Sequence, residues 1–284
     1  MHADVVACLA CPYCGTALSR VDSALRCHSG HSFDVARQGY VTLLPRGFRA
    51  GAEAGDSADM VAARAGFLAA GHYAPLTDAL TAAVAAAPAG PVLDIGAGTA
   101  HHLAATLTAG SGAERVGIAL DLSRYAARRA ARSHPRVGAV VADAWTALPV
   151  RDGAVGVVLD VFAPRNGAET ARVLRPGGLL VVVTPGSGHL AELVDALGLL
   201  SVDERKDARL AAALEPHLSP VERSTLTWTL SLSRPDAVAA VAMGPSARHL
   251  TPDDLARRAA ALPDPVEVSA TVDLRTYRSP SPTR

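Results

Sequence analysis

The sequence lacks long apolar runs, lysine and any excess of one charge. No stretch reaches the roughly 18 consecutive apolar residues of a membrane-spanning helix, so no membrane partner is expected. The first residues do not form a basic segment followed by an apolar one, which predicts no secretion signal and a cytoplasmic protein. The formal net charge is zero, so bulk charge does not indicate a nucleic-acid partner.

Lysine is almost absent, because Lys206 is the only one among 27 basic residues. The other basic residues are arginines, and alanine is abundant, which is typical of proteins from GC-rich genomes. The alternative explanation is contact between arginines and RNA phosphates, which guanidinium groups bind well. Composition alone favours the genomic explanation.

Cysteine is missing from all but the first tenth of the chain, which holds Cys8, Cys11, Cys14 and Cys27. A secreted disulfide domain would spread its cysteines, so this cluster indicates a metal site. Zinc prefers four thiolate or imidazole ligands arranged as a tetrahedron. We predict Cys11, Cys14, Cys27 and His31 as these ligands. Since the protein supplies all four, the zinc would be structural rather than catalytic.

Two neighbouring residues compete for places in this zinc site. Cys8 precedes Cys11 with the same two-residue gap that separates Cys11 from Cys14. We leave Cys8 out because Cys11 and Cys14 flank Pro12 and lead into a glycine turn. His28 directly follows Cys27, and chelation by adjacent residues would be strained, so His31 is preferred.

The chain divides into three sections by composition. Its 284 residues, of which 49% are apolar, suffice for one α/β domain with a small appendage. We expect a zinc-binding module at 1–44, a linker rich in glycine and alanine at 45–58, and the larger domain at 59–284.

The larger domain shows alternating strand and helix patterns. Strands are expected at 91–95, 115–120, 137–141, 154–161, 179–184, 224–232 and 266–277, and helices at 58–70, 74–87, 101–109, 123–133, 167–174, 235–241 and 252–262. Such alternation predicts a doubly wound, seven-stranded, mostly parallel sheet. The last two strands would form an antiparallel hairpin at its edge, with a helical insertion.

A glycine-rich turn follows the first strand of this domain. Gly96 and Gly98 let the backbone approach a ligand closely, and the next helix offers free N–H groups. Asp94, Asp121 and Asp143 each lie at or just beyond the carboxyl end of a strand. Ligands bind at that edge in open α/β sheets, where a carboxylate such as Asp121 can accept ribose hydroxyls and Asp143 an adenine amine. Each of these carboxylates alone is more often a turn-former or a helix cap.

This turn, together with the segment 174–178, resembles the class I methyltransferases, which have a Rossmann-like fold and use S-adenosylmethionine. The glycine common at the third turn position is Ala100 here. A narrower likeness lies in the zinc module and in segments 33–44, 55–61 and 70–76, where Gln38-Gly39-Tyr40 and Gly71-His72-Tyr73 are the specific parts. Over essentially the whole chain the sequence resembles the RlmA family of 23S rRNA (guanine-N1)-methyltransferases.

Segment 162–166 and Thr184-Pro185 with His189 resemble the macrolide-resistance branch of that family. The resemblance implies methylation of guanine 748, rather than 745, in a hairpin of the exit tunnel, which would hinder macrolide binding. It makes 1–44 an RNA-recognition module and 59–284 a methyltransferase domain. The implied zinc ligands are the four predicted above, and the implied cofactor contacts are Tyr73, Gly98, Thr99 and His189. Without the resemblance, Tyr73 would be a packing aromatic and His189 a helix cap.

Guanine N1 carries a proton at neutral pH, so the reaction needs a base. Asp160, near the end of the fourth strand, is our candidate, and an ordinary strand-end carboxylate is the alternative. Phe162 would stack on the flipped guanine or belong to the core. The arginines expected to grip the RNA hairpin, each also readable as an ordinary surface charge, are Arg20, Arg26, Arg37, Arg46 and Arg49.

Two rival functions stay open at this point. A methyltransferase acting on a small molecule, such as an antibiotic intermediate, would share the fold. A zinc-dependent RNA-binding protein without catalysis would share the module, although Asp94, Gly96, Gly98 and Asp121 argue against it. The sequence leaves the oligomeric state open, with a homodimer as one alternative.

Overall fold

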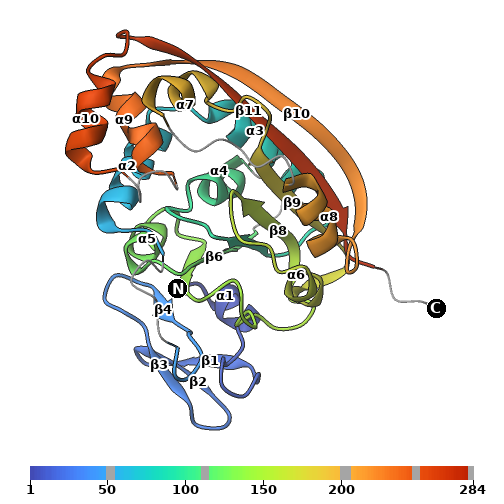
Figure 1. Cartoon of the computed structure of the whole chain (residues 1–284). Helices are drawn as coiled ribbons and strands as arrows, with labels where there is room; N and C mark the ends of the chain where they lie inside the picture. Colours follow the sequence, from blue (N-terminus) through green and yellow to red (C-terminus); the bar gives the residue numbers. More distant parts are fainter. Residues whose placement is uncertain (49–54, 110–114, 199–205, 245–249, 281–284) are drawn as a thin grey trace.

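A computed structural model describes residues 1–48, 55–109, 115–198, 206–244 and 250–280 (Figure 1). The strands are β1 (Leu18–Val21), β2 (Ala24–Cys27), β3 (Ser32–Asp34), β4 (Val41–Thr42), β5 (Val92–Ile95), β6 (Gly117–Asp121), β7 (Val137–Val141), β8 (Val155–Val161), β9 (Leu174–Pro185), β10 (Ser219–Leu232) and β11 (Val266–Arg278). The helices are α1 (Ala3–Cys8), α2 (Ala58–Ala69), α3 (Ala74–Ala86), α4 (His101–Ala109), α5 (Arg124–Ala130), α6 (Gly167–Val173), α7 (Ala191–Leu197), α8 (Lys206–Leu214), α9 (Arg234–Ala242) and α10 (Pro252–Ala259).

The centre of the molecule is a sheet in the order β10-β11-β9-β8-β5-β6-β7-β4. From β9 to β4 all neighbouring strands are parallel, which confirms the predicted class I arrangement. Strands β5, β7 and most of β8 are buried throughout, because helices or the N-terminal segment cover both faces of the sheet. This explains why their sequences are runs of valine and leucine rather than alternating patterns.

The prediction of seven strands was one short. Val41 and Thr42 pair in parallel with Val140 and Val141, and the Leu43 N–H donates to the Val141 carbonyl at 2.9 Å. Two residues are too few for a recognisable strand pattern, yet they cover the edge of β7 that would otherwise be open. The N-terminal segment therefore contributes a strand to the central sheet.

The opposite edge carries the antiparallel hairpin that the sequence predicted. Strands β10 and β11 pair along their lengths, with α9 and α10 inserted between them, and β11 pairs antiparallel with β9. We expected the segment 175–178 to lie between a helix and a strand that starts at residue 179. It belongs instead to β9, at the point where the pairing with β8 shifts register. Helices α1, α7 and α8 were not predicted.

Alternate side chains of the sheet feed two apolar cores. One core joins Leu159 and its neighbours to α2, α3, α4, α5, α7, α9 and α10. The other joins Val158 and its neighbours to α6, α8, α1 and the small antiparallel sheet β1-β2-β3, through Leu25 and Phe33. None of the described helices combines the length and the apolar character needed to cross a bilayer.

Candidate metal centre and active site

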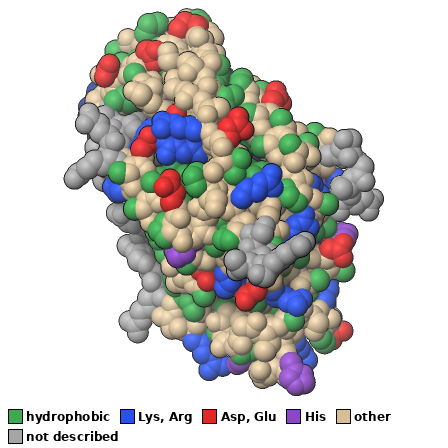
Figure 2. All heavy atoms as spheres, turned by 90° about the vertical axis from the view of Figure 1, so that its right-hand side faces the viewer, with side chains coloured by type: hydrophobic (Ala, Val, Ile, Leu, Met, Phe, Trp, Pro, Cys, Tyr) green, Lys and Arg blue, Asp and Glu red, His purple; other side chains and the backbone are tan. Residues whose placement is uncertain are grey.

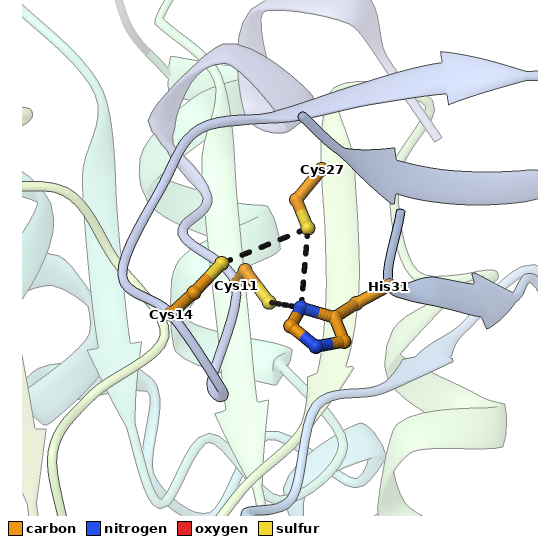
Figure 3. A group of neighbouring side chains, drawn as sticks. All are labelled: Cys11, Cys14, Cys27 and His31. Carbon is orange, nitrogen blue, oxygen red and sulfur yellow. Dashed lines mark hydrogen bonds between the residues drawn. The ribbon is translucent and has the colours of Figure 1, made fainter. Parts of the chain in front are cut away.

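Four side chains of the N-terminal segment point toward one another between the ribbon turns (Figure 3). The ligand atoms of Cys11, Cys14, Cys27 and His31 all lie within 4.8 Å of one another. The Sγ atoms of Cys14 and Cys27 are 3.7 Å apart, and Nδ1 of His31 lies 3.3 Å from Sγ of Cys27 and 3.5 Å from Sγ of Cys11. Ligands at about 2.3 Å from a tetrahedral zinc ion would be about 3.8 Å apart, so this group fits the metal.

Two glycine turns build this metal centre. Gly15, with a φ of 71°, closes the first turn and donates its N–H to the Cys11 carbonyl at 2.8 Å. Gly30, with a φ of 83°, closes the second, in which the Cys27 N–H donates to the His31 carbonyl at 3.1 Å. Hydrogen bonds from Thr16 lower the pKa of the Cys14 thiol to about 5, which favours the thiolate that zinc requires.

Cys8 lies outside this group, as the sequence analysis assumed. Its Sγ donates to the Asp4 carbonyl at 3.2 Å within α1, and burial raises the pKa of its thiol. His28 is likewise not part of the described group.

The turn after β5 is held against the ends of β6 and β8. The Ala97 N–H donates to the Leu120 carbonyl at 3.0 Å, and the Gly98 N–H donates to Oδ2 of Asp121 at 2.8 Å. A Cβ at Gly96 would lie 2.6 Å from Cβ of Ala163, so this position requires glycine. Thr99 follows in the same turn, and Ala100 adopts a φ of 57° with its methyl group buried.

Three carboxyl groups meet near this turn: Asp94 and Asp160 are buried, and Asp121 is partly buried. Burial, with the charges of Asp121 and Asp160 added, raises the pKa of Asp94 well above its usual range. Burial also raises the pKa of Asp121, against the effect of N–H groups donated by Ser123 and Gly98. Burial raises the pKa of Asp160 to about 8, although Nε of Arg165 lies 3.8 Å from its Oδ1. Such a concentration of carboxyl groups favours a positively charged ligand.

Asp143 lies one strand further along the sheet, beyond the end of β7. Its Oδ1 accepts the Trp145 N–H at 2.9 Å, so Asp143 stabilises a turn, which was the alternative to a role in binding the donor. Its other carboxylate oxygen leaves the predicted contact with an adenine amine open to test.

Tyr73 and His189, which are 116 residues apart in sequence, meet in the structure. Oη of Tyr73 lies 3.2 Å from Nε2 of His189, and Nδ1 of His189 accepts the Thr271 N–H at 3.2 Å. Burial lowers the pKa of His189 to about 4, so the ring is neutral at pH 7. Because Nδ1 accepts, the proton is on Nε2 and is donated to Tyr73. His189 is therefore not the helix cap that its sequence position suggested.

Phe162 completes this group from the end of β8. It adopts a φ of 56°, and 41% of its side chain is exposed. Its ring centroid lies 6.3 Å from that of Tyr73 and 6.0 Å from that of His189. An exposed aromatic residue in this strained conformation, two residues after Asp160, is more consistent with a binding surface than with core packing.

The sequence analysis assigned no role to Asp56 and Arg64. Arg64, on α2, forms an ion pair with Asp56 and donates to the Met243 carbonyl at 2.6 Å. Its Cδ lies 3.3 Å from the position of a Cβ on Gly98, so it covers the glycine turn. Oγ of Ser123 donates to the Asp56 carbonyl at 2.7 Å. Asp56 lies in segment 55–61, which belongs to the family resemblance, whereas no feature of the sequence indicated a role for Arg64.

Comparison with known proteins agrees with this geometry. The family model for the RlmA N-terminal zinc ribbon matches residues 9–49, and a methyltransferase-domain model matches residues 92–178. A relative from Streptomyces fradiae, named 23S rRNA (guanine(748)-N(1))-methyltransferase, is 53% identical over 282 residues, which cover 98% of this chain and 99% of the relative.

The chain belongs to the RlmA family.

A second relative of this RlmA-family protein comes from Micromonospora griseorubida. It is 52% identical over 298 residues, covers 98% of this chain and 99% of its own length, and is provisionally named as a 23S rRNA (guanine-N1)-methyltransferase. A solved structure from Bacillus halodurans, provisionally named a methyltransferase, has a TM-score of 0.50 at 16% identity and covers 72% of this chain and 98% of its own. That likeness concerns the fold alone.

Proposed function

We infer that this RlmA-family protein is a 23S rRNA (guanine-N1)-methyltransferase that uses S-adenosylmethionine, and that guanine 748 is its target. The observation that carries this conclusion is the likeness to the Streptomyces fradiae enzyme along nearly the full length of both chains. The zinc-type cluster and the carboxyl groups at the sheet edge agree with it.

The donor would lie across the carboxyl ends of β5 and β6. Asp121 would accept the ribose hydroxyls, and the Gly96–Gly98 turn would let the amino-acid part of the donor approach the backbone. Asp143 is our candidate for the contact with its adenine amine. Thr99, Tyr73 and His189 would line the remainder. The donor supplies a methyl group on a positively charged sulfur, and the buried carboxyls Asp94 and Asp160 favour that charge.

Asp160 is our candidate for the base that takes the proton from guanine N1. Its pKa of about 8 lets a useful fraction ionise near neutral pH while keeping it basic. Oδ1 of Asp160 is buried and has no hydrogen-bond partner among the described residues, so the N–H of a bound guanine would supply the missing partner. Phe162 would hold the flipped guanine by stacking.

The zinc-binding module would present arginines to the RNA hairpin. Arg20, Arg26, Arg37 and Arg46 are exposed on this part of the molecule, and Arg49 lies outside the described residues. The guanidinium carbon of Arg46 lies 4.9 Å above the ring of Tyr13, which itself contacts His31 of the metal centre. Ribosomal RNA as substrate implies action in the cytoplasm, and a methyl group on guanine 748 would obstruct macrolides.

Primer extension on 23S rRNA tests this function. The protein and S-adenosylmethionine should produce a new stop at guanine 748, since a methyl group on N1 blocks base pairing. An RNA with adenine at position 748 is the matched control and should give no stop. A methyl group at another nucleotide would contradict the target, and unmodified RNA beside a methylated small molecule would contradict the class of substrate.

A further inference from the structure

A cavity of about 680 Å³ lies between α5 and the segment that leaves the zinc-binding module. Tyr40 and Phe48 form one wall, and Arg124, Tyr125 and Arg128 form the other. Its volume is within the range of roughly 300–1,000 Å³ found for small-ligand pockets. None of the residues assigned above to the methyl donor lines it. The cavity is therefore a separate feature that the proposed function leaves without a role.

The sequence of α5 explains why these side chains face outward. Oγ of Ser123 accepts the Ala126 N–H and starts the helix, and Ala126, Ala127 and Ala130 pack against the sheet. The opposite side of the helix is left to arginine and tyrosine. Arg124 and Arg128 are one turn apart, so their guanidinium groups share one face, and 50% of Tyr125 is exposed beside them.

The two arginines of this cavity are not paired with acidic side chains in the described part of the chain. Within the described ranges, neither Arg124 nor Arg128 has a carboxylate within 4.0 Å. Some other arginines are paired, as Arg223 and Arg275 are with Asp207. Figure 2, which views the molecule from the side of β10 and β11, shows basic and acidic side chains mixed on that face. Asp56 also lines the cavity, but it is paired with Arg64, so Arg124 and Arg128 leave the lining with a positive charge in a protein of zero net charge.

Aromatic rings next to arginines without carboxylate partners match the chemistry of single-stranded RNA. Its bases stack on aromatic side chains, and guanidinium groups bind its phosphates. The cavity also lies beside the donor edge of the sheet, because Leu122 and Ser123, which follow Asp121, contribute to its lining. A nucleotide held here would lie beside the donor, at the ends of β6 and β7, whereas the guanine would react at the end of β8.

We propose that this cavity binds one unpaired nucleotide of the rRNA hairpin, other than the target guanine. Its base would lie against Tyr125, and its phosphates on Arg124 and Arg128. The site would join the zinc-binding module to the catalytic domain through the RNA, since each contributes one wall. This proposal rests on the proposed function and adds a specific contact to it.

Anisotropy titration of a labelled 23S rRNA hairpin tests this site. Tyr125→Leu should raise the Kd for the RNA by about five-fold or more, whereas Tyr125→Phe should keep the wild-type value, because stacking needs only the ring. Arg128→Ala should lower the slope of log K against log salt by about 0.7, the value for one phosphate contact on a single strand. Arg129→Ala, the neighbouring exposed arginine outside the cavity, should leave the slope unchanged.

Three results would overturn the proposal. Equal effects of Arg128→Ala and Arg129→Ala would indicate diffuse attraction rather than a site. A loss of S-adenosylhomocysteine affinity in Tyr125→Leu by calorimetry, with unchanged RNA affinity, would assign the cavity to the donor. A lower molecular mass of Tyr125→Leu than of the wild type in light scattering would assign the cavity to an interface between copies of the protein. An inactive wild type contradicts the proposed function, whereas an active wild type with an unaffected Tyr125→Leu variant contradicts this site alone.

Discussion

At the scale of single residues, local environment decides what each carboxyl group can do. Asp121 is committed to two backbone N–H groups, which fixes its orientation toward the donor edge. Burial raises the pKa of Asp160 to about 8, although the guanidinium of Arg165 and a backbone hydrogen bond from Ala163 lower it. We therefore propose that the same residue type serves for positioning in one place and for proton transfer in the other.

The pH dependence of the reaction should report the ionisation of Asp160. Only the carboxylate can accept a proton, so the rate should rise with pH and level off above about 8. Asp160→Asn should lower the rate by about 10²- to 10⁴-fold and abolish this rise, with S-adenosylhomocysteine still bound. Single-turnover rates across pH 6–9 measure both effects. The same pH limb in Asp160→Asn would assign the ionisation to another group.

The folded state should also lose stability as this group ionises. The pKa of Asp160 rises from about 4 in the unfolded chain to about 8 in the fold, so the folded state binds more protons between these values. The contribution of this carboxyl to the free energy of unfolding is therefore present below pH 4 and falls as pH rises toward 8. Urea unfolding measures this effect: the free energy of unfolding should differ less between pH 6 and pH 9 for Asp160→Asn than for the wild type.

The two kinds of cysteine should respond differently to the same substitution. Cys14→Ser should remove one of four ligands and release zinc, because a hydroxyl is a poor replacement for a thiolate. Cys8→Ser is the matched control, since Cys8 binds only backbone carbonyls in the structure. Metal content measured by mass spectrometry separates them. Full zinc occupancy in Cys14→Ser would contradict the ligand set.

The site residues that could be predicted from the sequence are those that belong to a short sequence pattern. The cysteine spacing and the carboxylates at strand ends are readable because each depends on neighbours along the chain. The contact of Arg64 with the turn at Gly98, and that of Tyr73 with His189, depend on how distant elements pack. The first was missed, and the second entered only through the family resemblance.

At the scale of elements, the turn between β5 and α4 is the most constrained part of the site. Gly96→Ala should lower the free energy of unfolding by about 2–4 kcal/mol and weaken donor binding, since its Cβ would collide with Ala163. Gly177→Ala is the matched control: its φ of 70° is similar, but no atom lies within 4 Å of the added Cβ. It should cost only about 1 kcal/mol. Thermal melts measure the stability of both variants, and calorimetry measures their donor binding. Equal effects of Gly96→Ala and Gly177→Ala would refute the role of close packing.

The elements that sequence analysis found are those with strong, long patterns. The parallel strands were readable from uninterrupted valine and leucine runs, and Ser123 was readable as a helix cap. Strand β4 was missed because two residues are too few to show the alternating pattern of a strand. Strand β9 starts earlier than predicted, because its glycines lie where the pairing with β8 shifts register. Short helices such as α7 give too few turns for an apolar stripe to emerge.

At the scale of the whole molecule, the zinc-binding module shares a core with the catalytic domain. Leu9, Leu25 and Leu43 are fully or almost fully buried in the same cluster as Leu93 and Val140 of the central sheet. Strand β4 adds backbone pairing to this contact. The division at 44 and 58 stays a prediction, because part of the first section is integral to the sheet.

Removal of zinc should therefore destabilise the whole chain rather than the module alone. A chelator should lower the melting temperature of the protein by about 10 °C or more, in one cooperative transition. The Cys14→Ser variant treated with the same chelator should show no further shift. Differential scanning calorimetry makes the measurement. A main transition that keeps its temperature after zinc has left would show that the two parts are independent.

The central claim is that the methyl donor lies across the carboxyl edge of the sheet with its sugar on Asp121. A crystal structure with S-adenosylhomocysteine tests it most directly. We predict ribose hydroxyls at about 2.6–3.0 Å from the Asp121 carboxylate, with the sulfur near Asp160 and Phe162. Density for the ligand elsewhere, with Asp121 bonded only to Gly98 and Ser123, would contradict it.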